Sequence, residues 1–367
     1  MQGHQRRFVS LGARGIATAL LVLVTASDRA GAQVPAAPTV RPDEGAFEVQ
    51  QVDGLTLRDP KRAKDLPLVI CYPKGEGPFP VIVFSHGAGG SGPMVIALPR
   101  FWAAHGYVGI APTHADSLAL RTERAAGVPW REFLGSTLRN SRSGPDRARD
   151  VSFILDELGA LEAKVPALKG KIDRRRIGVG GHSLGAYTAQ LIGGVTVDLP
   201  GGPKGQSFAD DRVRAILLLS GQGRGQQGLT EHSWDALTQP MMSLTGTLDR
   251  GAGGQGFAWK GEPFAFSPPG DKYHLIIEGA HHGSFTGRFA GESPPARSGG
   301  FLGGGLPGRP GARFGLGGDQ KAIFGEVKTA TLAFWDAYLK EDPVAKAYLQ
   351  SDALPRASQG AVKLSRK

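Results

Sequence analysis

Short apolar runs alternate along the chain with segments of helical periodicity. Runs that are apolar at nearly every position are typical of strands buried on both faces of a parallel sheet. Two earlier segments indicate an opening antiparallel pair. We predict the antiparallel pair at 47–52 and 66–72, and the buried strands at 80–85, 107–111, 176–180, 213–220, 241–245 and 273–278.

Four segments carry their apolar residues at the spacing of a helix. In 145–158, for example, Val151, Ile154 and Leu158 fall on one stripe. The other predicted helices are 94–105, 184–192 and 320–339. Strands that alternate with helices predict an α/β sandwich with a mainly parallel sheet. We assign this sandwich to one domain, residues 47–345, followed by a C-terminal tail, residues 346–367.

The first residues have the pattern of an export signal. Three arginines precede an apolar stretch at 15–26, and Ala30-Gly31-Ala32 supplies a small-residue cleavage site. We therefore predict a signal peptide at 1–32 and a flexible, Pro- and Ala-rich leader at 33–46, and we expect a periplasmic or extracellular protein. A buried N-terminal helix is the alternative interpretation.

Composition indicates a second segment that does not belong to the hydrophobic core. The chain is 40% hydrophobic and 21% charged, as globular proteins are, but it contains 55 glycines among 367 residues and has a net charge of +10. Many of these glycines lie in 286–318, which also holds four arginines and a single acid, Glu292. Such a stretch cannot bury enough apolar surface to offset its ordering entropy, so we predict a flexible insertion within the domain.

The charge of this insertion suggests a partner. A basic, flexible tract could contact an anionic surface, although an inert solvated loop is the alternative. Aromatic residues are not interleaved through it at regular spacing, so we do not expect nucleic-acid binding. No run of eighteen apolar residues occurs in the chain, so we expect no transmembrane segment.

A G-x-S-x-G pentapeptide, Gly181-His182-Ser183-Leu184-Gly185, lies between the strand 176–180 and the helix 184–192. A serine on so tight a strand-to-helix turn exposes its hydroxyl, and the flanking glycines let neighbouring backbone pass. We predict Ser183 as a nucleophile, with a structural turn serine as the alternative. The N–H of Leu184, at the start of the helix, would face a developing oxyanion.

A second oxyanion donor is expected from an earlier loop. The segment Ser85-His86-Gly87-Ala88-Gly89-Gly90 follows the strand 80–85, and we assign the donor to the N–H of Ala88. The alternative is that its glycines only turn the chain. His86 precedes the nucleophile in the chain, and we interpret it as a group that fixes the loop.

The remaining partners of such a serine follow in the order acid, then histidine. Asp249 comes just after the strand 241–245 and is the predicted acid. Its competitors are Asp271, which precedes a strand and so lies at the wrong edge of the sheet, and Glu278, at the end of the strand 273–278. His281 and His282 both follow the strand 273–278, and only one of them can be the base, because adjacent side chains diverge and only one can face Ser183.

Neither a metal ion nor a cofactor is expected. Adjacent histidines point to opposite sides and cannot chelate one ion together, and no G-x-x-x-x-G-K-[ST] phosphate loop occurs.

With these residues in place, the chain resembles the secreted α/β-hydrolases of the branch that includes platelet-activating-factor acetylhydrolase, chlorophyllase and dienelactone-hydrolase-like proteins. The resemblance implies an eight-stranded, mostly parallel sheet flanked by helices, a Ser-His-Asp triad and no cofactor. Those roles fall on Ser183, His282 and Asp249. In the resembling hydrolases the catalytic histidine sits in a Gly-Ala-x-His-x-x-Phe pattern, which selects His282, and not His281, as the base. The segments that carry the resemblance are 80–90, 104–107, 146–155, 172–185 and 279–285.

The function expected is a serine carboxylester hydrolase that acts through an acyl-enzyme on a small-molecule or lipid-like ester of short-to-medium acyl length. Two alternatives stay open. One is a lipase or polyesterase that acts on an insoluble substrate, and the other is a catalytically silent binding protein that keeps the fold.

Overall fold

The computed structural model describes residues 45–121, 128–292 and 317–367. The predicted signal peptide, almost all of the leader and most of the insertion 286–318 therefore lie outside the described residues.

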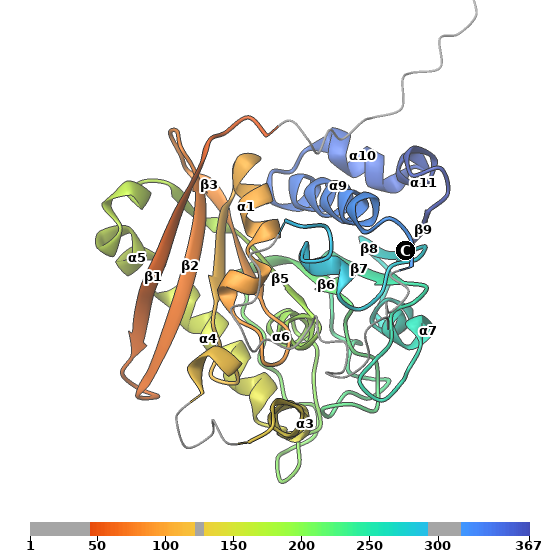
Figure 1. Cartoon of the computed structure of the whole chain (residues 1–367), viewed down its shortest axis with the longest axis horizontal. Coiled ribbons are helices and arrows are strands. Elements are labelled where there is room, and N and C mark those ends of the chain that lie inside the picture. The colour runs from red at the N-terminus through yellow and green to blue at the C-terminus, as the bar shows by residue number, and fades with distance from the viewer. Residues whose placement is uncertain (1–44, 122–127, 293–316) are drawn as a thin grey trace, which may run out of the picture. The chain divides into compact units, whose positions relative to one another are not determined.

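One nine-stranded sheet organises this part of the chain (Figure 1). Its strand order is β1-β2-β4-β3-β5-β6-β7-β8-β9, with β3 to β8 parallel and with β1, β2 and β9 antiparallel to their neighbours. The predicted α/β-hydrolase fold class is thereby confirmed. The strands are β1 (Val49–Asp59), β2 (Lys64–Pro73), β3 (Phe79–Ser85), β4 (Val108–Pro112), β5 (Ile172–His182), β6 (Val213–Leu219), β7 (Met241–Gly246), β8 (Lys272–Ile277) and β9 (Val362–Arg366).

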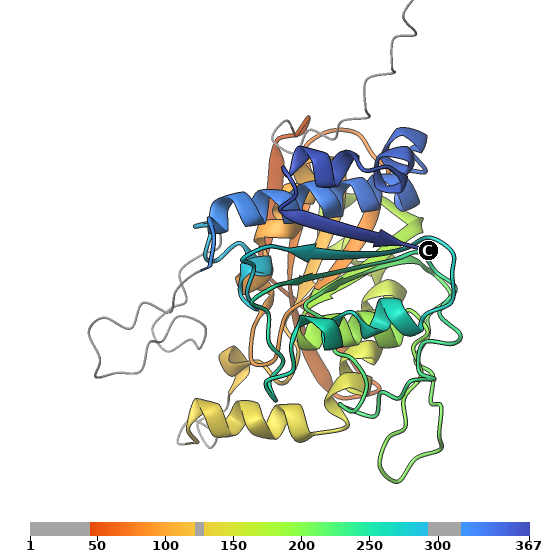
Figure 2. The ribbon, with the colours of Figure 1, turned by 90° about the vertical axis from the view of Figure 1, so that its right-hand side faces the viewer.

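Helices cover both faces of the sheet, which Figure 2 shows nearly edge-on. Apolar residues of α1 and α9 belong to the core on one face, and those of α4, α5 and α6 to the core on the other. The helices are α1 (Ala97–Ala104), α3 (Trp130–Arg139), α4 (Ser143–Asp156), α5 (Leu158–Lys164), α6 (Leu184–Ile192), α7 (Phe257–Lys260), α8 (Glu262–Phe266), α9 (Gln320–Leu339), α10 (Pro343–Gln350) and α11 (Ala353–Ala357), with short 3-10 turns η1 (Gly92–Val95), η2 (Leu118–Leu120), η3 (Pro166–Leu168) and η4 (Ser284–Thr286).

The continuous apolar run of β3 is explained by burial on both faces. Successive side chains of a strand point to opposite sides, so Ile82 and Phe84 enter the core beside α9, whereas Val81 and Val83 enter the core beside α4. All four side chains are fully buried. A strand in this position needs apolar residues at every position rather than at alternate ones.

The prediction of a C-terminal tail at 346–367 is wrong. These residues complete α10 and form α11 and β9, and β9 pairs antiparallel with β8, with Val362 opposite Ile277. Leu349, Leu354 and Val362 are buried in the core that α9 covers. The elements are five to eight residues long, too short to show a clear period in sequence. The same strand makes the sheet nine-stranded where eight strands were expected.

None of the helices in the described ranges combines the length and the apolar character that crossing a bilayer requires.

Candidate active site

Ser183 occupies the one-residue turn between β5 and α6. Its backbone has φ 56° and ψ −119°, a conformation that costs energy in any residue with a side chain. The turn is possible because its neighbours are glycines. A Cβ at Gly181 would overlap the backbone of Gly185, and a Cβ at Gly185 would overlap the carbonyl oxygen of Ser85. The local sequence thus permits a strained serine at the carboxyl end of a central strand.

The other candidate residues lie after neighbouring strands of the same sheet. Ala88 follows β3, Asp249 follows β7 and His282 follows β8. Since β3 to β8 are parallel, their carboxyl ends meet at one edge of the sheet, which is where ligands bind in open α/β sheets.

Asp249 and His282 are hydrogen-bonded. The distance from His282 Nδ1 to Asp249 Oδ1 is 3.1 Å, and the Asp249 side chain is fully buried. Thr245 Oγ1 donates to the other carboxylate oxygen over 3.0 Å. Burial alone would raise the pKa of Asp249, but the hydrogen bond with His282 and the charge of Lys260 outweigh burial and lower this pKa. An ionised Asp249 keeps the imidazole proton on Nδ1 and leaves Nε2 as the proton acceptor.

Ser183 and His282 line the same cavity, which has a volume of about 290 Å³. Ala88 lines it too, and its side chain is half-buried. Leu184 is the first residue of α6, so its N–H has no acceptor within its own helix. Apolar side chains form much of the remaining wall: Met94, Val95, Leu134, Leu138 and Trp259.

Three competitors lie elsewhere. Asp271 precedes β8 and pairs with Lys346 over 3.1 Å. Glu278 is exposed and accepts a hydrogen bond from Thr247 Oγ1. The ring of His281 packs edge-on against Phe289 with centroids 4.8 Å apart, and its Nδ1 accepts the N–H of Gly283. The structure therefore pairs His282 with Asp249, whereas Asp271 and Glu278 bond other groups and the His281 ring packs on Phe289.

The residue between the first glycine and the serine of the pentapeptide, His182, supports the loop that carries His282. Its Nε2 donates to the carbonyl oxygen of His282 over 2.7 Å. Burial, assisted by the charge of His282, lowers the pKa of His182 to about 3. The ring is therefore a neutral donor near pH 7 and ties β5 to the segment after β8.

Sequence reasoning missed two residues that contact this pair. Ser220 follows β6 with φ 53°, and its Oγ lies 2.7 Å from His282 Nδ1. Lys260, at the end of α7, is 3% exposed, and its Nζ lies 3.7 Å from Asp249 Oδ1. Ser220 could have been found as a polar residue directly after a buried strand. No local pattern marks Lys260, because its position depends on how α7 packs.

In the described residues, no group of three or more His, Cys, Asp or Glu side chains is placed to hold a metal ion.

One family model matches part of the chain. Residues 41–126 match the family described as Chlorophyllase. This segment spans β1 to β4 and includes the loop with Ala88, but it ends before Ser183, Asp249 and His282. No curated protein matches the chain. The fold and the family match together indicate an ester-cleaving α/β-hydrolase that is similar to the chlorophyllase family over residues 41–126.

Proposed function

We propose that the protein is a serine carboxylester hydrolase with Ser183 as nucleophile, His282 as general base and Asp249 as the group that orients the imidazole. The single observation that carries this proposal is the strained backbone of Ser183 in a cavity that His282 also lines, with His282 bonded to a buried, ionised Asp249. Strain of this kind persists at functional sites.

The proposed reaction has two halves. Ser183 Oγ attacks the ester carbonyl carbon while its proton passes to Nε2 of His282, and the carbonyl oxygen becomes an oxyanion. The N–H groups of Ala88 and Leu184 would stabilise that charge. The intermediate then expels the alcohol, which takes the proton from His282 and leaves an acyl group on Ser183. Water repeats the sequence on the acyl-enzyme and releases the acid.

The cavity supports a substrate of limited size. About 290 Å³ is at the small end of ligand pockets, and much of its wall is apolar. An ester of short-to-medium acyl length suits such a cavity better than a long chain does.

The test is a p-nitrophenyl ester series, from acetate upward, with wild type and Ser183→Ala. Ser183→Ala should lose turnover by a factor on the order of 10⁴ to 10⁶ while it keeps its fold. A matched control is Ser136→Ala, which removes an exposed hydroxyl from α3 and should behave as wild type. Wild-type turnover by the folded Ser183→Ala protein would refute the proposal. A wild type inactive on every ester would instead favour a silent binding protein.

A further inference from the structure

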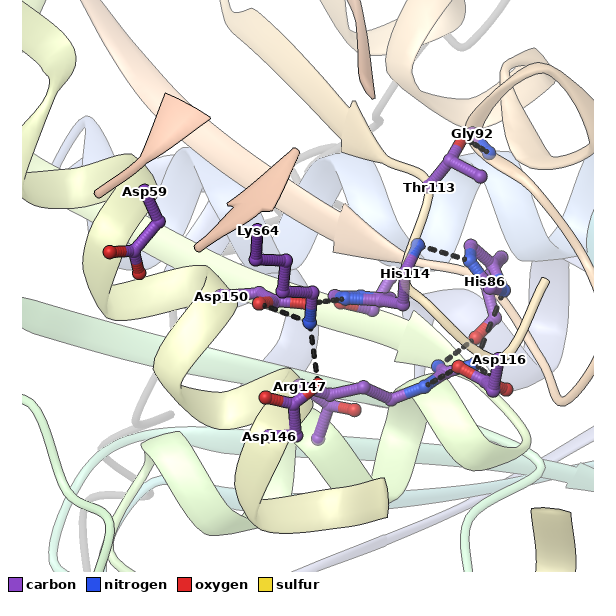
Figure 3. Close-up of polar contacts among 12 residues, drawn as sticks. Asp59, Lys64, His86, Gly92, Thr113, His114, Asp116, Asp146, Arg147 and Asp150 are labelled. Atoms are coloured by element: carbon purple, nitrogen blue, oxygen red, sulfur yellow. Dashed lines mark hydrogen bonds and ion pairs between the residues drawn. The ribbon is translucent and has the colours of Figure 1, made fainter. Parts of the chain in front are cut away.

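The loop that follows β3, residues 86–90, packs against a buried charged cluster that the proposed reaction leaves unexplained (Figure 3). Arg147, on α4, is 1% exposed. Its Nε and Nη2 donate to the two carboxylate oxygens of Asp116 over 2.8 and 2.7 Å. Burial alone would raise the pKa of Asp116, but the charge of Arg147 outweighs burial and holds this pKa well below its ordinary value. Both members of the pair are therefore charged.

Arg147 also holds the backbone of the loop. Its Nη1 donates to the carbonyl oxygen of His86 over 2.5 Å, and its Nη2 lies 3.3 Å from the carbonyl oxygen of Gly87. The Gly87 oxygen accepts two more hydrogen bonds, from His86 Nδ1 over 2.6 Å and from the N–H of Gly90 over 3.1 Å. Several donors thus hold the peptide group that joins Gly87 to Ala88 in one orientation.

That orientation decides where the N–H of Ala88 points. In a trans peptide the carbonyl and the following N–H point in opposite directions. The Gly87 carbonyl faces Arg147, so the N–H of Ala88 faces away from Arg147, and Ala88 lines the cavity that contains Ser183. Arg147 and Asp116 line a separate groove.

We propose that Arg147 and Asp116 are positioning residues that set the oxyanion hole by fixing the peptide between Gly87 and Ala88. The inference rests on the proposed serine esterase function and adds two residues to it. Without the guanidinium the Gly87 oxygen loses one of its three donors and the His86 oxygen loses its donor from Arg147, so the peptide is held less firmly, and the N–H of Ala88 can turn away from the reacting oxygen. Ser183 and its two partners would stay in place, because they lie on other strands.

The rest of the cluster keeps neutral imidazoles around this pair. His86 Nε2 accepts the N–H of His114 over 3.0 Å, so its proton sits on Nδ1, the atom that bonds Gly87. Burial, and then the charge of Arg147, lowers the pKa of His86 well below its ordinary value. His114 in turn bonds Asp150 over 2.8 Å and Ser85 over 3.1 Å. Although this is a second serine–histidine–aspartate chain, all three side chains are fully buried and no substrate reaches them.

The experiment compares p-nitrophenyl acetate with its thiono analogue, in which sulfur replaces the carbonyl oxygen. Sulfur is a weak hydrogen-bond acceptor, so a working oxyanion hole favours the oxygen ester. For Arg147→Met we expect kcat on the oxygen ester to fall about 100-fold with KM within about threefold, since the lost donor acts only in the transition state. The oxygen-to-sulfur rate ratio should fall at least about tenfold. A purely structural role would lower both rates equally.

Arg149→Met is the matched control. It removes the same charge from the same helix, but Arg149 is exposed and lies over the ring of Phe208, away from the loop. It should keep the wild-type ratio. If Arg147→Met does not fold, Asp116→Asn decides the question, because it keeps the side-chain shape and removes only the charge that holds the guanidinium.

The outcomes separate the two claims. An unchanged oxygen-to-sulfur ratio in folded Arg147→Met or Asp116→Asn, with an active wild type, overturns the positioning role alone. A wild type that hydrolyses neither ester overturns the esterase function and this inference with it.

Discussion

Two serines at neighbouring strand ends share an unusual backbone. Ser183 after β5 and Ser220 after β6 both have positive φ, which for a residue with a side chain costs about 1–3 kcal/mol. The sheet holds each in place, since the N–H of Ser183 bonds Leu219 over 2.9 Å and the N–H of Ser220 bonds Leu244 over 2.8 Å. Ser183 lines the cavity, and the hydroxyl of Ser220 lies within hydrogen-bond distance of His282 Nδ1.

The two adjacent histidines should differ sharply in their effect on turnover. His282→Ala removes the group bonded to Asp249 and should lower kcat on a short-chain ester about 10⁴-fold or more. His281→Ala removes a ring that packs on Phe289 and should cost far less, about tenfold at most. Steady-state kinetics of both variants measures this ranking. The reverse ranking would move the base to His281 and leave the fold unaffected.

Removing the buried charge of Lys260 should change how the stability of the fold depends on pH in the acid range. The lowered pKa of Asp249 means that its ionised form stabilises the fold above the ordinary aspartate pKa, and that this contribution is lost as pH falls through the lowered value. In Lys260→Met the ammonium charge no longer opposes the effect of burial on Asp249, so the pKa of Asp249 rises. Stability should then begin to fall at a higher pH than in wild type.

The control for this profile is Lys74→Met, which removes an exposed lysine paired with Glu48 at the surface. The two profiles would coincide if Lys260 did not act on Asp249.

At the scale of elements, β9 is part of the core rather than an appendage. Val362 is 1% exposed and packs in the core that α9 covers. Val362→Ala removes two buried methyl groups and should lower the free energy of unfolding by about 2 kcal/mol, measured by urea denaturation. Lys363→Ala, at the next and exposed position, is the control and should change it by no more than about 0.5 kcal/mol. Equal small effects would mean that β9 contributes little to stability.

Elements could be predicted from sequence where local signals agree. Helices 184–192 and 320–339 have the predicted bounds, and the second is preceded by Asp319, whose side chain accepts the N–H groups of Lys321 and Ala322. Asp249 and His282 follow clear apolar strands, as expected, and their catalytic roles stay predictions. Lys260 and Arg147 could not be found, because their partners lie 11 or more positions away in sequence and only tertiary packing brings them together.

At the scale of the molecule, the parallel arrangement of β3 to β8 assembles the site. Five consecutive neighbours in the sheet, β3, β5, β6, β7 and β8, end at one edge. The segments after them supply Ala88, Ser183, Ser220, Asp249 and His282 in that order. One of these residues follows each strand, so the position of a residue just after an apolar run is the local pattern that indicates it. The family match covers only the first of these segments.

The central claim is that the acyl group passes through Ser183. The most direct measurement is to quench wild type during turnover of p-nitrophenyl acetate, digest it and locate the acetyl group by mass spectrometry. We expect one acetyl group on the peptide that contains Ser183 in wild type, and none on this peptide in Ser183→Ala. An acetyl group on another residue, or turnover that remains undiminished in Ser183→Ala, would contradict it.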